Sequence, residues 1–143
     1  MSDDPHDLTR FVAAQRDSHD IALAELTAGR KRSHWIWYTL PQLAGLGSSA
    51  MTRHYAIANL AEARAYLAHP LLGPRYLGCV AALLTHRGTP AHRIMGDVDA
   101  MKLRSSLTLF VHAGADPLVA EALATFFDGP DIATERLLAI SAP

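Results

Sequence analysis

Apolar residues recur along the chain at three- and four-residue spacings, which is the period of an amphipathic helix. The first run, residues 7–27, brings its apolar side chains to one helical face, and Gly29 after it is a typical helix stop. β-Branched and aromatic residues, which favour strands, are scattered and never alternate with polar residues for long. The pattern therefore predicts an all-α fold whose first helix covers residues 7–27.

Capping and breaking residues divide the rest of the chain into further short helices. Ser33 is expected to cap a helix that Pro41 ends, Ser48 or Ser49 to cap the next one, and Asn59 to open a capping box. Further starts and stops follow at Gly73, Gly88, Thr89, Gly96, Asp97 or Asp99, Gly114, Asp116, Asp128 and Asp131. Every break is short, so we expect a single domain over residues 1–143 with about seven or eight short helices.

Composition limits the classes of function. Half of the 143 residues are hydrophobic and 19% are charged, which is typical of a globular domain, and the net charge of −1 gives no field that would attract nucleic acid in general or a membrane surface. The sequence shows neither a signal peptide nor an apolar stretch long enough to span a bilayer. Cys79 lies in an apolar run and is expected to be a buried thiol. We therefore expect a cytoplasmic protein, a monomer or a homodimer.

The segment 31–42 is the most unusual part of the chain, because it holds both tryptophans. His34, Trp37 and Tyr38 are spaced so that one helical face would present an imidazole, an indole and a phenol. Such a face can stack on a heterocycle and form hydrogen bonds with it. Alternatively, Trp35 and Trp37 anchor the core and His34 braces a neighbouring element.

The segment 45–49 superficially matches a glycine-rich dinucleotide fingerprint. That fingerprint requires a preceding strand and a βαβ unit, and neither is predicted here. Free backbone N–H groups and the hydroxyls of Ser48 and Ser49 at a helix start can still bind an anion. Ordinary loop and capping chemistry explains the same residues.

A third cluster, residues 95–108, places charged and hydroxyl side chains in the middle of a predicted helix. Lys102 precedes Ser105 by one turn and follows Asp99 by one turn. Either Asp99 and Lys102 pair on a solvated face, or Lys102 and Arg104 line a pocket for an anionic substrate. Arg75, near another predicted helix start, is a further candidate for a ligand or a carboxylate. The eight histidines show no metal-binding spacing, so we expect neither a metal nor another cofactor.

Several of these segments resemble the DUF1810 family of uncharacterised bacterial proteins over about residues 8–138. The first match comprises Lys31, Ser33, His34, Trp35, Ile36, Trp37, Tyr38, Leu40, Pro41 and Gln42. The others are Gly45, Leu46, Gly47, Ser49, Tyr55, Ile57, residues 65–67, His69, Pro70, Leu72, Gly73, Arg75, Asp99, residues 101–106 and residues 108–110. The resemblance implies a small, superhelically arranged all-helical domain and no established activity. Some members are labelled calpastatin, but that name belongs to a disordered protease inhibitor, which this composition does not resemble.

Two functions fit these residues. An enzyme would bind a phosphorylated or nucleotide-like metabolite, with NAD- or ADP-ribose-linked hydrolysis as one example, and would use His34 or Asp97 as general acid or base. Its expected ligand-binding residues are Lys31, Trp37, Tyr38, Gln42, Ser48, Ser49, Arg75, Lys102, Arg104 and Ser105. A non-enzymatic module would use the same surface to bind a partner protein. Convergence of these residues on a closed cleft, with the tryptophan segment and the lysine helix facing a shared hollow, would favour the small molecule. Their spread over a flat or convex face would favour the partner protein.

Overall fold

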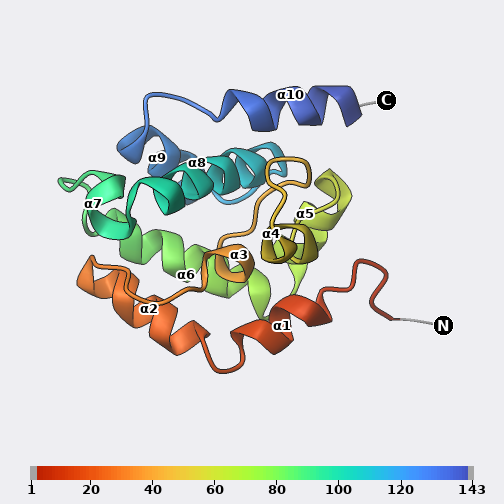
Figure 1. The fold of residues 1–143 in the computed structure, drawn as a ribbon, viewed down its shortest axis with the longest axis horizontal. Helices are drawn as coiled ribbons and strands as arrows, with labels where there is room; N and C mark the ends of the chain where they lie inside the picture. The colour runs from red at the N-terminus through yellow and green to blue at the C-terminus, as the bar shows by residue number, and fades with distance from the viewer. Residues whose placement is uncertain (1–2, 142–143) are drawn as a thin grey trace.

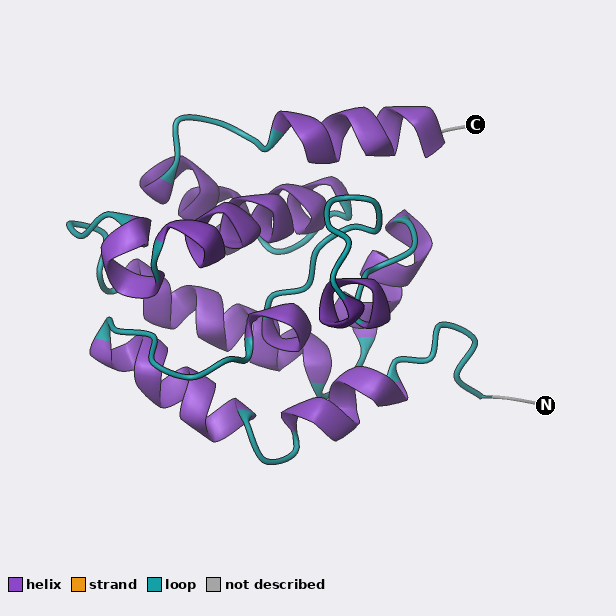
Figure 2. Cartoon of the chain, in the orientation of Figure 1, coloured by secondary structure: helices purple, strands orange, loops and turns teal. Residues whose placement is uncertain are grey.

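The computed structural model describes residues 3–141, without the side chains of residues 140 and 141, and in that range contains ten helices and no strand (Figures 1 and 2). The helices are α1 (Thr9–Gln15), α2 (His19–Ala28), α3 (Ile36–Thr39), α4 (Ala50–His54), α5 (Leu60–Ala68), α6 (Leu72–Leu84), α7 (Ala91–Met95), α8 (Asp97–His112), α9 (Pro117–Phe126) and α10 (Ile132–Ser141). The predicted all-α class is confirmed. The number of helices exceeds the prediction, in part because the structure divides the predicted helix 7–27 into α1 and α2.

Helices α6 and α8 form the middle of the molecule, and the other helices pack around them (Figure 1). Helices α2, α5 and α9 contact α6, while α3, α5, α7, α9 and α10 contact α8. Helices α5 and α6 meet at 88° across a short break, a nearly orthogonal crossing. Within residues 3–141, no single helix has both the length and the apolar composition to cross a bilayer. Helices α5 and α6 have that length and composition only when they are taken together across their bend.

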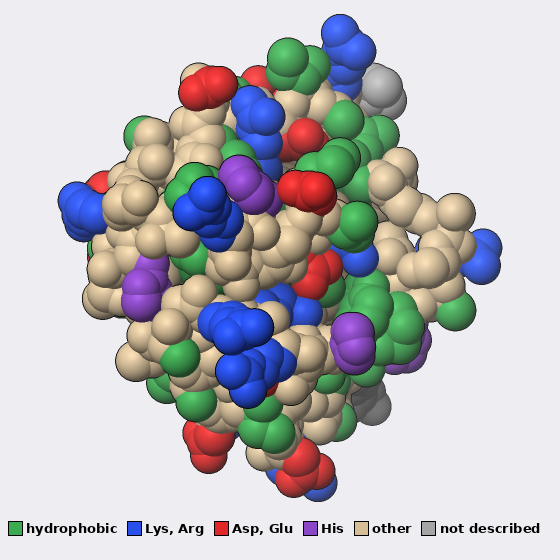
Figure 3. Space-filling model, turned by 60° about the vertical axis from the view of Figure 1, so that its left-hand side comes forward, with side chains coloured by type: hydrophobic (Ala, Val, Ile, Leu, Met, Phe, Trp, Pro, Cys, Tyr) green, Lys and Arg blue, Asp and Glu red, His purple; other side chains and the backbone are tan. Residues whose placement is uncertain are grey.

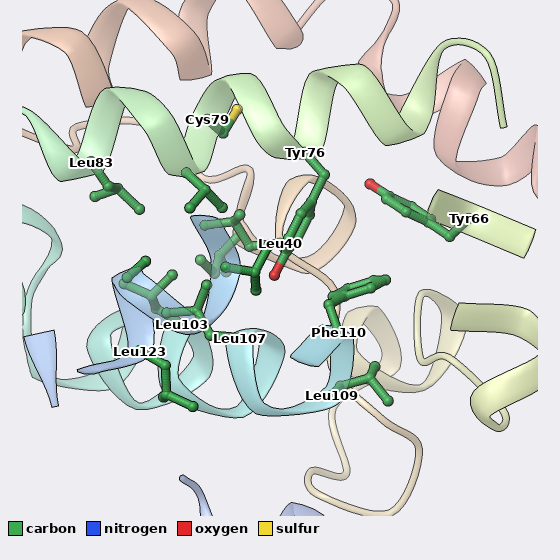
Figure 4. Close-up of a cluster of buried hydrophobic side chains, with 14 of the residues drawn as sticks. Leu40, Tyr66, Tyr76, Cys79, Leu83, Leu103, Leu107, Leu109, Phe110 and Leu123 are labelled. Carbon is green, nitrogen blue, oxygen red and sulfur yellow. The ribbon is translucent and has the colours of Figure 1, made fainter. Parts of the chain in front are cut away.

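In the core between α6 and α8, the aromatic rings of Tyr66, Tyr76 and Phe110 lie among aliphatic side chains (Figure 4). The ring centroids of Tyr76 and Phe110 lie 4.4 Å apart, and those of Tyr66 and Phe110 lie 5.4 Å apart. Tyr76 is fully buried, and its hydroxyl forms a hydrogen bond of 2.9 Å with the hydroxyl of Ser106. Cys79 lies in the same core, where burial raises the pKa of its thiol to about 12. The prediction of a buried thiol is confirmed.

The predicted helix over residues 7–27 is wrong, because the chain breaks it between α1 and α2. The Ser18 hydroxyl donates a hydrogen bond to the carbonyl oxygen of Ala14, and a serine that binds the backbone in this way competes with helix hydrogen bonding. Just before the break, the Gln15 amide turns into the core and donates to the carbonyl oxygen of Tyr38 at 2.7 Å and to the Tyr66 hydroxyl at 3.0 Å. The break therefore lets α1 and α2 each pack against the core. The stop at Gly29 is confirmed by its left-handed φ of 76°.

Two of the predicted caps are confirmed and one is wrong. The Ser49 hydroxyl accepts the backbone N–H of Thr52 at the start of α4, and Asn59 caps α5 in the same way. Ser33 caps no helix, since its hydroxyl donates to Glu25 and α3 begins only at Ile36. The sequence pattern showed a residue able to cap, but the tertiary partner Glu25 was not visible from it.

Candidate functional site

A pocket of about 250 Å³ opens beside the first half of α8, and we call it the α8 pocket. Its lining from α8 consists of Val98, Met101, Lys102 and Ser105, which recur at the spacing of one helical face. The rest of its lining comes from the loop before α4, from α4 and from the start of α10: Gln42, Leu46, Gly47, Thr52, Asp131 and Ala133. Three segments far apart in the sequence therefore meet around one hollow.

Lys102 is the cation of the α8 pocket, and no carboxylate within residues 3–141 pairs with it. Its ammonium nitrogen lies 5.2 Å from the centroid of the Trp37 ring, which is a cation–π distance. Among residues 3–141, the ion pairs involve other basic groups, and Lys102 donates no hydrogen bond to a side chain or a backbone carbonyl. The structure thus brings the tryptophan segment and the lysine helix together, and the described part of the chain supplies no counterion to Lys102.

The other polar groups of the pocket differ in how far they are already occupied. The Asp131 carboxylate accepts the backbone N–H of Thr134 at 2.9 Å and its hydroxyl at 2.6 Å, so this negative charge is directed at the start of α10. The Ser105 hydroxyl donates to the carbonyl oxygen of Met101, and Thr52 accepts a hydrogen bond from Ser49. The side-chain amide of Gln42 binds no other group in the described part of the chain. Lys102 and Gln42 are therefore the groups most available to a ligand.

A buried ion pair between Lys31 and Asp99 connects the tryptophan segment to α8, the helix that carries Lys102. The Lys31 ammonium lies 2.7 Å from the carboxylate of Asp99, and the Lys31 side chain is only 5% exposed. It also donates to the carbonyl oxygen of Ser33 and lies 4.8 Å from the centroid of the Trp35 ring. The Asp99–Lys102 pair that their spacing allowed is not formed, because Asp99 is bound to Lys31. Lys31 thus holds the segment before α3 against α8 and is not accessible to a ligand.

Glu25 anchors the same segment to α2. Its carboxylate accepts hydrogen bonds from the backbone N–H groups of Arg32 and Ser33, from the Ser33 hydroxyl and from the Trp35 indole, all between 2.7 and 2.9 Å. Burial by itself would raise the pKa of Glu25, but these hydrogen bonds outweigh it and lower the pKa from 4.5 to about 2. One carboxylate thus fixes the course of the chain into the tryptophan segment.

This anchor predicts a pH-dependent stability. Because the folded-state pKa of Glu25 lies below the unfolded value, its contribution is complete above pH 4.5 and is lost as the pH falls toward 2. We expect Glu25→Gln to lower the free energy of unfolding at pH 7 by about 1–2 kcal/mol, a figure reduced for contact with solvent. Urea unfolding at pH values from 7 to 3 should show a smaller loss of stability in this variant than in the wild type. Parallel pH profiles for the two proteins would contradict the assignment.

The remaining predicted site residues do not line the α8 pocket. The Arg104 guanidinium donates to the carbonyl oxygen of Gly129 at 2.8 Å, and Arg75 reaches the Gln15 side chain at 3.4 Å. Tyr38 packs against Tyr55. Ser48, His34 and Asp97 are exposed. These three predicted residues do not line the pocket and take no part in the contacts described above. The structure therefore gathers Gln42, Lys102 and Ser105 in the pocket, with Trp37 beneath Lys102 and Ser49 beside Thr52, and it places no predicted acid or base there.

Seven of the ten lining residues were not among the predicted site residues: Leu46, Gly47, Thr52, Val98, Met101, Asp131 and Ala133. The sequence predicts Asp131 only as a helix start, although a carboxylate at an N-cap can also face a hollow. Val98 and Met101 share the helical face of Lys102, and this spacing is a signal that was available in the sequence. Thr52 gave no signal, since its place depends on how the loop 42–49 folds back onto α8. Figure 3 shows Lys and Arg side chains gathered near the middle of one face, with acidic and apolar side chains beside them.

Fold and pocket together define a small all-α protein with a surface pocket whose cation pairs with no carboxylate of the described residues. The family model described as "Protein of unknown function (DUF1810)" matches residues 5–138, so the chain belongs to this family and the resemblance found in the sequence is confirmed. The crystal structure of the conserved hypothetical protein Rv1873 from Mycobacterium tuberculosis is similar, with a TM-score of 0.93 and 46% sequence identity over 95% of this chain and 99% of the other. No curated protein matches the chain significantly.

Proposed function

We propose that this protein binds a small anionic metabolite, such as a sugar phosphate or another phosphorylated compound, in the α8 pocket. The observation that carries the proposal is the Lys102 ammonium, which lines a hollow and has no carboxylate partner within residues 3–141. A cation held over an indole ring and left unpaired in a pocket favours an anionic ligand, because the ligand supplies the missing counterion.

The neighbouring groups suit the same ligand. Gln42 can donate its amide N–H to an anion, and Ser105 and Thr52 can exchange hydrogen bonds with ligand oxygens. Asp131 would repel an anion, but its charge is partly offset by the N-terminus of α10, which it caps. The pocket volume of about 250 Å³ suits a phosphate with a few attached carbon atoms better than a whole dinucleotide.

Binding, rather than hydrolysis, is the function that this geometry supports. Neither His34 nor Asp97 is among the lining residues of the α8 pocket, so neither is placed to act as general acid or base on a ligand bound there. Trp37 carries Lys102 over its ring, and Tyr38 packs against Tyr55. Stacking of a heterocycle on either ring is therefore not part of the proposal.

A thermal-shift screen against sugar phosphates, nucleotides and NAD fragments tests the proposal. A ligand present at 100 times its dissociation constant adds about 2.7 kcal/mol of stability, which corresponds to roughly 5–10 °C for a domain of this size. We expect Lys102→Met, which keeps the length of the side chain and removes its charge, to abolish the shift. Arg64→Met removes a charge from the exposed face of α5 and should leave the shift unchanged. Equal shifts in wild type and Lys102→Met would contradict the proposal.

The lysine content allows a second, direct measurement. The chain has two lysines, and one of them, Lys31, is buried in its ion pair. An amine-reactive reagent should therefore modify Lys102 much faster than Lys31, and peptide mass spectrometry reads the two sites separately. A ligand that binds in the α8 pocket should slow modification of Lys102 and leave modification of the N-terminal amine unchanged.

A further inference from the structure

Exposed apolar side chains are concentrated around the α8 pocket. Val98 and Met101 line the pocket and are 66% and 71% exposed. Ile132, 62% exposed, lies in the chain between two pocket residues, and Met51 directly precedes the pocket residue Thr52. Among the described residues, only two other large apolar side chains, Ile21 and Leu71, are comparably exposed. Isolated exposed apolar residues are ordinary, but their grouping around one hollow indicates a surface that is covered when it functions.

The arrangement along α8 strengthens this point. Ser105, a polar residue at the inner end of the stripe, is 5% exposed, whereas Val98 and Met101 at the outer end are open to solvent. The face therefore has polar groups inside and apolar groups at the rim, the reverse of an ordinary surface helix. A ligand that fits it needs a charged group that reaches inward and an apolar body that remains outside.

We propose that the α8 pocket binds an amphipathic organic anion: its anionic group contacts Lys102, and its apolar body lies on Val98 and Met101. This inference rests on the proposed function and narrows the ligand to aryl or alkyl phosphates and carboxylates. Lys102 has no carboxylate partner within residues 3–141, so it favours an anionic group on the ligand. The exposed side chains of Val98 and Met101 favour an apolar body on the same ligand. The pocket volume is about 250 Å³, so the apolar body of a larger ligand must lie on the rim.

The test compares two probes that share one charged group. Isothermal titration of the full chain with 1-naphthyl phosphate and with glycerol 3-phosphate isolates the effect of the apolar body. We expect 1-naphthyl phosphate to bind about tenfold more tightly, which corresponds to partial burial of one ring face. Met101→Gln should reduce this advantage about threefold or more, since glutamine keeps the length and the helix propensity of the side chain and removes its apolar surface.

Matched variants separate the two parts of the ligand. Ile21→Gln alters a comparably exposed apolar residue on α2 and should leave both affinities unchanged. Lys102→Met should weaken the binding of both phosphates. The uncharged alcohol 1-naphthol should bind the wild type at least tenfold more weakly than 1-naphthyl phosphate does. Both phosphates should protect Lys102 from amine modification.

Several outcomes would overturn the inference. Equal affinities for the two phosphates would remove the role of the rim and leave the proposed function intact, whereas absence of binding and of Lys102 protection with either probe would count against both. An advantage of 1-naphthyl phosphate that survives Met101→Gln would place the apolar body elsewhere. Sedimentation analysis that shows a dimer, dissociated by Met101→Gln, would mean that a second copy of the chain covers the rim.

Discussion

Gly73→Ala is expected to unfold the protein or to lower its free energy of unfolding by about 3 kcal/mol or more. Gly73 lies in the first turn of α6, where this helix meets α5 at 88°. A Cβ atom at this position would lie 2.1 Å from the carbonyl oxygen of Leu67, far inside the contact distance of the two atoms. The obstacle is backbone, so no side-chain rotation relieves it and α5 itself must move. Urea unfolding followed by helical circular dichroism measures the loss.

Gly78→Ala is the matched control for this prediction. Gly78 lies on an exposed part of the same helix, and an added Cβ would meet no atom within 4 Å. Alanine is preferred to glycine inside a helix, so this variant should be about 0.5–1 kcal/mol more stable than the wild type. A Gly73→Ala variant that unfolds within about 1 kcal/mol of the wild type would show that the corner between α5 and α6 tolerates a side chain.

The corner at Gly73 illustrates how far the sequence predicted the fold. Local signals were sufficient where a cap or stop acts on its own helix, as at Gly29, Ser49 and Asn59. They failed where a distant partner decides. Ser33 has the chemistry of a cap, but Glu25 binds it from the preceding helix. The apolar spacing of residues 7–27 likewise continues across a break, because both halves face the same core.

The candidate site was predictable to a similar extent. Charge and spacing identified Lys102 and Ser105, and the concentration of aromatic residues identified Trp37, which lies beneath Lys102. Spacing did not reveal which charges neutralise one another. Asp99 stands one turn from Lys102 in the same helix, yet it binds Lys31 from another segment, so Lys102 has no carboxylate partner within residues 3–141. The chemistry of the pocket thus depends on a pairing between residues that are 68 positions apart in the sequence.

Lys31→Ala is expected to lower the free energy of unfolding by about 2–3 kcal/mol. Removal of one partner from a buried ion pair typically costs about 3–5 kcal/mol, because the other charge remains buried and unpaired. Asp99 keeps some contact with solvent, with 19% of its side chain exposed, and this places the effect below that range. The double variant Lys31→Met with Asp99→Asn should lose less stability than the two single variants added together, since neither charge is then left alone.

This coupling is measured by unfolding the wild type, Lys31→Met, Asp99→Asn and the double variant in urea. The measurements are made at low salt and in 0.5 M sodium chloride as working concentrations. We expect a coupling energy of about 1–3 kcal/mol that changes little with salt, because salt screens buried pairs far less than exposed ones. The same pair should support the pocket: without Lys31, the tryptophan segment is held less firmly against α8, and ligand protection of Lys102 should weaken. A coupling energy near zero, or one that disappears in salt, would mean that the pair is open to solvent. Lys102 would then be positioned by its contact with Trp37 rather than by the ion pair beneath it.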